Sequence, residues 1–126
     1  MPVQLNHTIV WSKDRTKSAR FLATLLGLPE PAKVWHFDVV QLDNGVSLDF
    51  ADAKEPVQSQ HYAFLVGEPE FRAIFSRIVE QSVVYWADPK QEQPGEINRA
   101  DGGRGVYFAD PNGHLFEVIT RPYGGG

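Results

Sequence analysis

The chain has 126 residues, which suits one compact domain and is too short for two ordinary ones. Its residues are 42% hydrophobic and include eight Phe, four Tyr and three Trp, so a fully disordered chain is excluded. The net charge of −4 is mild and the basic residues are scattered, which argues against nucleic acid or an anionic membrane as a partner. Because cysteine is absent, any metal must be bound by imidazole and carboxylate groups.

The N-terminal segment, residues 1–7, lacks the basic and long apolar regions of a signal peptide. No apolar run approaches the roughly 20 residues that span a bilayer. We therefore expect a cytoplasmic protein with a small molecule as its partner.

The first half of the chain predicts a strand, a helix and a hairpin, in that order. Residues 7–11 have the composition of a strand. The helix is indicated by residues that recur at helical spacing, namely Ser18, Phe21, Leu22, Leu25 and Leu26. Residues 34–42 are rich in β-branched and aromatic side chains and predict a second strand. The turn residues 43–45 and the strand 46–51 complete a hairpin.

The second half repeats this order. Residues 61–66 predict a strand, and 83–86 predict a short one. Between them lies a helical stripe made of Phe71, Ile74, Phe75, Ile78 and Val79. The long polar loop 88–105 is open to three interpretations: a lid, a substrate-binding loop or a disordered segment. Strands at 106–109 and 114–120 form the final hairpin.

Matching polar residues in the two halves suggest an internal duplication. Each half opens its first strand with a histidine, His7 or His61. Each half also has an Asn-Gly pair followed, four residues after the glycine, by an acid, which is Asp49 or Glu117. These matches predict two βαββ(β) units related by a pseudo-twofold axis, with equivalent positions converging on a shared cleft.

The two histidines and Glu117 form a candidate set of metal ligands. Side chains alternate across a strand, so Glu117 points away from the face of Phe116 and Val118, which we expect to be covered by a helix. A buried carboxylate is costly unless it is paired or binds a metal. From the residues alone, a metal site at His7, His61 and Glu117 and an ordinary structural role for each of them are equally open.

At four places the sequence resembles the vicinal oxygen chelate superfamily, which includes glyoxalase I, fosfomycin-resistance thiol transferases, extradiol dioxygenases and bleomycin-binding proteins. The matching segments are the opening residues 5–9, the helix 18–28, the strand that starts at His61, and residues 106–118. The last of these is the most specific, with the sequence Val-Tyr-Phe-Ala-Asp-Pro-Asn-Gly-His-Leu-Phe-Glu-Val. The resemblance covers nearly the whole chain.

The resemblance implies an α+β fold in which two paired βαβββ modules form a curved sheet around a cleft. Residues 1–126 would form a single domain, with module one at about 5–53 and module two at about 60–121. It also implies a homodimer, because single-chain members of the family usually pair.

The implied site holds one divalent metal ion (Zn, Ni, Mn, Co or Fe(II)) on His7, His61 and Glu117. Asp49 falls where glyoxalase-like members place a fourth ligand, usually a glutamate. Because it is one methylene shorter, Asp49 is open as a ligand, a water-mediated ligand, a substrate contact or a base. Tyr107 resembles a residue that contacts substrate in some members, with core packing as its alternative.

The leading functional prediction is a metal-dependent lyase or isomerase of the glyoxalase type, acting on a small oxygenated substrate. Glu117 or Asp49 would shuttle a proton in that reaction. An extradiol-type dioxygenase with non-haem Fe(II) is the first alternative, since two histidines and one carboxylate suit that ion. A non-catalytic drug-binding resistance protein is the second alternative.

Overall fold

The computed structural model describes residues 2–123 and divides the chain into two compact units, Met1–Val57 and Gln58–Gly126. The first unit contains β1 (His7–Ser12), α1 (Arg15–Leu26), β2 (Ala32–Val34), β3 (Phe37–Gln41) and β4 (Ser47–Asp52). The second unit contains β5 (His61–Leu65), α2 (Glu68–Glu80), β6 (Tyr85–Trp86), the short 3-10 helix η1 (Ala100–Gly102), β7 (Gly105–Ala109) and β8 (Leu115–Ile119). Each unit is described by itself.

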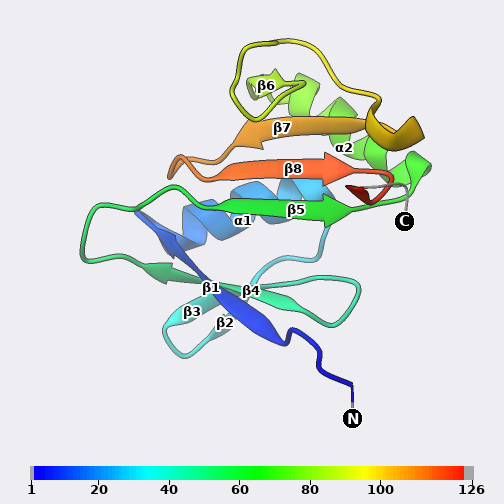
Figure 1. Cartoon of the computed structure of the whole chain (residues 1–126). Coiled ribbons are helices and arrows are strands. Elements are labelled where there is room, and N and C mark those ends of the chain that lie inside the picture. The colour runs from blue at the N-terminus through cyan, green and yellow to red at the C-terminus, as the bar shows by residue number, and fades with distance from the viewer. Residues whose placement is uncertain (1, 124–126) are drawn as a thin grey trace. The chain divides into compact units, whose positions relative to one another are not determined.

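Both units have the same mixed four-stranded sheet. The strand order is β1-β4-β3-β2 in the first unit and β5-β8-β7-β6 in the second. In each sheet the first strand in sequence runs parallel to the last, while the remaining pairs are antiparallel. Each unit carries one α-helix, α1 in the first and α2 in the second (Figure 1). The predicted α+β fold of two βαβββ modules is therefore confirmed.

Helix α1 has defined signals at both ends. The Asp14 carboxylate caps it by accepting the Lys17 backbone N–H at 3.1 Å. Gly27 ends it in the left-handed conformation, with φ of 70°, which glycine adopts without strain. Its buried side chains, including Leu22 and Leu25, pack on the face of the sheet that carries the apolar side chains of β1, β3 and β4.

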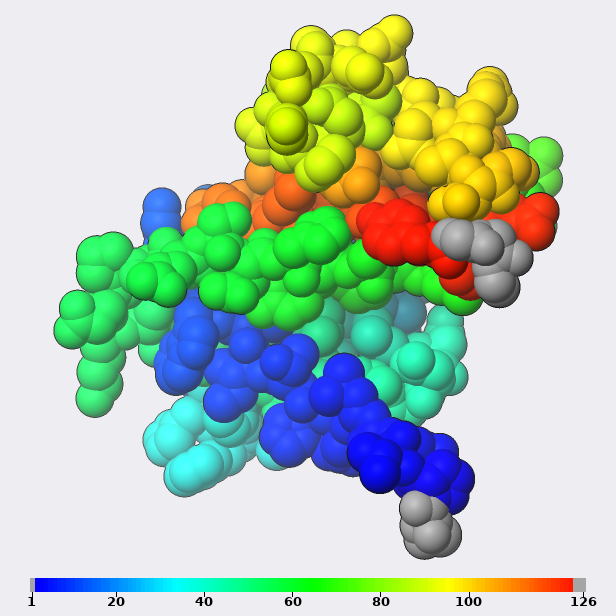
Figure 2. Space-filling model, in the orientation of Figure 1, coloured from blue at the N-terminus to red at the C-terminus, as the bar shows by residue number. Residues whose placement is uncertain are grey.

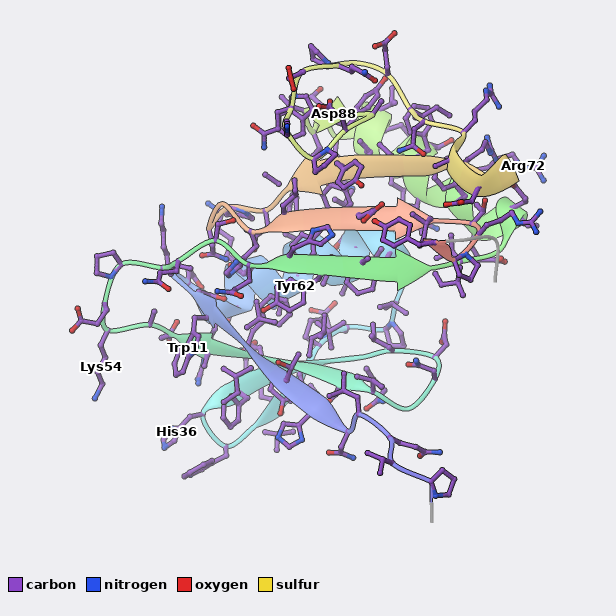
Figure 3. All side chains as sticks on the ribbon, in the orientation of Figure 1. Trp11, His36, Lys54, Tyr62, Arg72 and Asp88 are labelled. Carbon is purple, nitrogen blue, oxygen red and sulfur yellow. The ribbon has the colours of Figure 1, made fainter. Side chains whose placement is uncertain are left out.

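The prediction of a single strand over residues 34–42 is wrong, because the chain reverses at Trp35 and His36 between β2 and β3. Trp35 has a positive φ of 53°, and His36 lies at the tip of the hairpin (Figure 3). The Arg15 guanidinium donates to the His36 backbone carbonyl and lies 3.1 Å from the buried Asp38 carboxylate. Aromatic and β-branched residues flank this turn on both sides, so composition alone does not reveal it.

The second unit is built around aromatic side chains. Phe116 on β8 is fully buried and packs against the rings of Tyr62, Phe64 and Phe108. Helix α2 runs along one side of this sheet, and its buried face begins with Phe71 (Figure 1). Within residues 2–123, no helix is long and apolar enough to cross a membrane.

The long connection between β6 and β7 is held by its own hydrogen bonds. The Asp88 carboxylate accepts the Glu92 backbone N–H, which closes the first part of the loop (Figure 3). Asn98 pairs with Gly105 through two backbone hydrogen bonds, and η1 lies between them. These contacts favour an ordered loop over the disordered alternative.

Candidate metal centre

Strand register places a histidine and an acid in equivalent positions of the two sheets. In the first sheet, Asp49 lies opposite the residue two places after His7. In the second sheet, Glu117 lies opposite the residue two places after His61. Residues two apart on a strand share a face, so within each unit the histidine and the acid lie on the same side of the sheet.

In the second unit the two predicted ligands lie next to each other. His61 Nε2 is 3.1 Å from Glu117 Oε1. The Glu117 side chain is only 2% exposed, whereas that of His61 is 47% exposed. The carboxylate is thus buried at the sheet surface, with an imidazole between it and solvent. Such burial is costly unless the charge is compensated.

The backbone determines which nitrogen of the His61 ring carries a hydrogen. Its Nδ1 lies 3.0 Å from the Leu115 carbonyl oxygen. A carbonyl can only accept, so Nδ1 carries a hydrogen and the neutral ring presents a lone pair at Nε2. That lone pair points at a carboxylate oxygen, and two acceptors this close require a proton or a cation between them.

This pair suits a divalent metal ion. Two donors that are each about 2.1 Å from one ion lie about 3 Å apart when they subtend a right angle at it, as adjacent ligands do in octahedral coordination. The observed separation of 3.1 Å between His61 Nε2 and Glu117 Oε1 meets that condition. A metal-bound histidine also usually donates its other N–H to a carbonyl or carboxylate, as His61 does to Leu115.

The first unit holds the other two predicted residues. His7 Nδ1 lies 2.7 Å from the Asn6 side-chain oxygen, which leaves its Nε2 available in the same way. Asp49 accepts a hydrogen bond of 2.9 Å from the Ser47 hydroxyl and is half-buried. Among residues 2–123, no three histidine, aspartate or glutamate side chains gather as a metal-binding group within either unit. The ligand roles of His7 and Asp49 therefore stay predictions.

Tyr107 lies at the candidate centre. It is buried on β7 directly opposite Glu117 in the register, and its ring stacks on that of His61 with 6.1 Å between centroids. Burial raises the pKa of the Tyr107 hydroxyl, and hydrogen bonds with Tyr123 and Glu117 raise that pKa further. Tyr107 thus remains a neutral hydrogen-bonding group beside the carboxylate.

Tyr123 was not among the predicted site residues. Its hydroxyl donates to Glu117 Oε1 at 2.7 Å. This hydrogen bond is the largest cause of the raised pKa of Tyr123. Tyr123 follows the end of β8, where strand alternation no longer indicates direction. Its contact with Glu117 therefore could not be read from the sequence pattern.

His114 has a structural role. It is fully buried, and its Nδ1 accepts the Gln60 backbone N–H at 3.0 Å. Its ring meets Tyr62 edge-on, with 5.8 Å between centroids. Since 114 and 117 differ by an odd number, strand alternation directs His114 away from the face of Glu117.

Comparison with known proteins shows the family to which the chain belongs. Residues 4–118 match the model of the Glyoxalase/Bleomycin resistance protein/Dioxygenase superfamily. The chain is 32% identical to Glutathione transferase FosA from Serratia marcescens over 121 residues, which are 90% of this chain and 78% of that protein. It is 26% identical to Metallothiol transferase FosB from Lysinibacillus sphaericus (strain C3-41) over 126 residues, 95% of this chain and 84% of that one.

Among solved structures, Oxidase ChaP-H1 superposes with a TM-score of 0.96 at 60% identity. The match covers 98% of this chain and 100% of the oxidase. The family match spans both modules and includes His7, His61 and Glu117. The chain therefore belongs to the Glyoxalase/Bleomycin resistance protein/Dioxygenase superfamily.

Proposed function

We propose that the protein is a divalent-metal-dependent enzyme in which His61, Glu117 and His7 bind the metal ion. The observation that carries this proposal is the contact between His61 Nε2 and the buried Glu117 carboxylate at 3.1 Å. The Leu115 carbonyl holds the imidazole in the tautomer that a metal requires. The name of the metallothiol transferase relative supports metal dependence as well.

The residues around this pair suit a substrate with oxygen substituents. His61 and Glu117 would hold the ion, and the hydroxyls of Tyr107 and Tyr123 lie beside them as neutral donors. A divalent ion would supply Lewis acidity toward substrate oxygens, and Fe(II) would in addition support dioxygen chemistry. Asp49, held by the Ser47 hydroxyl, is the remaining candidate for a ligand or a base.

Among the possible reactions, we propose oxidation of a small oxygenated organic substrate. The likeness to Oxidase ChaP-H1, at 60% identity over nearly the full length of both chains, favours this class. Two histidines and one carboxylate are also the ligand set typical of non-haem Fe(II) oxygenases. This proposal advances the oxidative alternative ahead of the glyoxalase-type lyase reaction.

Thiol transfer to fosfomycin is the second candidate, favoured by the 32% identity to Glutathione transferase FosA. A phosphonate is normally bound by cationic side chains. The groups that contact the Glu117 carboxylate are instead the His61 imidazole and the Tyr123 hydroxyl, so this reaction ranks below oxidation.

Activity measurements on reconstituted protein test these classes. Metal-free protein is loaded separately with Fe(II), Mn, Co, Ni and Zn and assayed for dioxygen uptake with catechols and hydroquinones. Parallel assays follow hemithioacetal isomerisation and the loss of thiol with fosfomycin. We expect dioxygen uptake with Fe(II) that is lost in His61→Ala. Isomerisation or thiol loss without dioxygen uptake would contradict the oxidative assignment.

The ligand set is tested separately from the reaction. Metal analysis of protein purified without chelator is expected to show about one divalent ion per chain. His7→Ala, His61→Ala and Glu117→Ala should each lower that occupancy strongly. The exposed His36→Ala serves as the matched control, because His36 lies at the β2–β3 hairpin tip. Full occupancy in all three ligand variants would show that the metal binds elsewhere.

A further inference from the structure

Tyr123 joins the C-terminal segment to the candidate metal centre. Tyr123 is largely exposed, at 64%, yet its hydroxyl reaches a carboxylate that is almost completely buried. Figure 2 shows the C-terminal segment, in red, on the surface between β5 and the loop that contains η1. The side chain thus reaches inward from the surface, and only its polar end contacts Glu117.

Tyr123 and His61 converge on the same oxygen atom. Glu117 Oε1 lies 2.7 Å from the Tyr123 hydroxyl and 3.1 Å from His61 Nε2. A carboxylate oxygen has two lone pairs, so it can accept one hydrogen bond and still bind a cation. The tyrosine contact is therefore compatible with a metal ion between Glu117 and His61.

A second tyrosine strengthens this connection. Tyr107 lies opposite Glu117 in the strand register, and hydrogen bonding toward Tyr123 and Glu117 contributes to the raised pKa of its hydroxyl. Two phenol groups, one from β7 and one from the C-terminal segment, therefore lie at the same carboxylate, and the Tyr123 hydroxyl donates to it. A short hydrogen bond from a neutral hydroxyl to a carboxylate is strong and directional, so it restricts the rotation of the Glu117 side chain.

We infer that Tyr123 is a positioning residue that orients the Glu117 carboxylate for metal binding. The inference rests on the proposed metal site. In metalloproteins, ligating carboxylates are themselves hydrogen-bonded, and removing such a partner typically weakens metal affinity 10- to 100-fold. A tyrosine that competed with the metal for Glu117 would have the opposite effect, because its removal would tighten binding.

The sign of the change in affinity tests the inference. Co²⁺ is titrated calorimetrically into metal-free wild-type protein, Tyr123→Phe and a control, Tyr85→Phe. Tyr85 lies on β6 and packs edge-on against Phe75, so this variant makes the same substitution elsewhere in the second unit. We expect Tyr123→Phe to bind Co²⁺ about 10- to 100-fold more weakly than wild type, with Tyr85→Phe within about twofold. Equal or tighter binding by Tyr123→Phe would overturn the inference.

The visible absorption of the bound Co²⁺ gives a readout that a purely structural role would not change. We expect the bands to shift in Tyr123→Phe, because the hydrogen bond alters the donor strength of Glu117, and to be unchanged in Tyr85→Phe. Identical spectra in all three proteins would count against the inference.

His61→Ala separates the two proposals. If wild-type protein binds no Co²⁺, or His61→Ala binds it as tightly as wild type, the proposed metal site is wrong and the role of Tyr123 falls with it. If His61→Ala weakens binding and Tyr123→Phe does not, only the role of Tyr123 is wrong. Thermal unfolding followed by circular dichroism confirms that each variant is folded.

Discussion

Replacing Glu117 by glutamine should stabilise the metal-free protein while removing metal binding. The native carboxylate is buried, and desolvating an ion costs several kcal/mol even after relaxation. Part of this cost is recovered through the hydrogen bond from Tyr123, which is stronger to a charged acceptor than to an amide by about 1 kcal/mol. In the variant, an amide NH₂ at the place of Oε1 can donate one hydrogen to the lone pair of His61 Nε2 and the other to the Tyr123 hydroxyl oxygen.

Because the desolvation cost of the carboxylate exceeds the loss in hydrogen-bond strength, Glu117→Gln should raise the free energy of unfolding of the metal-free protein by about 1–3 kcal/mol. For a chain of this size that corresponds to a rise in melting temperature of roughly 3–10 °C. Urea unfolding in the presence of chelator, followed by circular dichroism, measures the difference. Glu96→Gln, at an exposed loop position, is the control and should change stability by less than about 0.5 kcal/mol.

Added metal should reverse the order of stability. At a free metal concentration of 100 times Kd, wild-type protein gains about 2.7 kcal/mol, whereas Glu117→Gln gains little. If Glu117→Gln destabilises the metal-free protein by more than 1 kcal/mol and metal leaves wild type unchanged, the carboxylate is a structural acceptor. That result would refute the reasoning.

Three further measurements test other parts of the structure. The pKa values of Tyr107 and Tyr123 are raised above the unfolded value of about 10, so the stability of the native protein should fall as the pH rises above 10. Absorbance at 295 nm just above pH 10 should show fewer than four tyrosines ionised in the folded protein. Ionisation of all four tyrosines near pH 10 without unfolding would contradict this prediction. Arg15→Ala should lower the free energy of unfolding by about 1–2 kcal/mol, because the buried Asp38 loses one of its two charged partners and keeps Lys33, and a loss below about 0.5 kcal/mol in urea unfolding would contradict this role. Light scattering after gel filtration should give twice the chain mass of 14.1 kDa for the predicted homodimer, and the mass of one chain would disprove it.

Much of the fold could be predicted because local signals and long-range pairing agree. The Asn-Gly turns set the spacing between each turn and its following acid, and the observed register places Asp49 and Glu117 in equivalent positions. Helix α1 ends at Gly27, where the backbone must adopt the left-handed conformation. These features depend on a few neighbouring residues, so they are visible in a sequence.

Other features depend on contacts that no local pattern reveals. The reversal at Trp35 and His36 is anchored by Arg15, which lies about 20 residues earlier in the chain. Tyr123 reaches Glu117 because the chain folds back after β8, beyond the range of strand alternation. The tautomer of His61 is set by a carbonyl 54 residues away. The chain reversal, the Tyr123 contact and the His61 tautomer all depend on tertiary structure.

The central claim is that His61 and Glu117 hold a divalent metal ion. Anomalous diffraction from crystals grown with Mn²⁺ or Co²⁺, recorded on both sides of the metal absorption edge, tests it most directly. The account predicts an anomalous peak about 2.0–2.3 Å from both His61 Nε2 and Glu117 Oε1. A peak elsewhere, with these two atoms still in direct contact at full metal concentration, would contradict it.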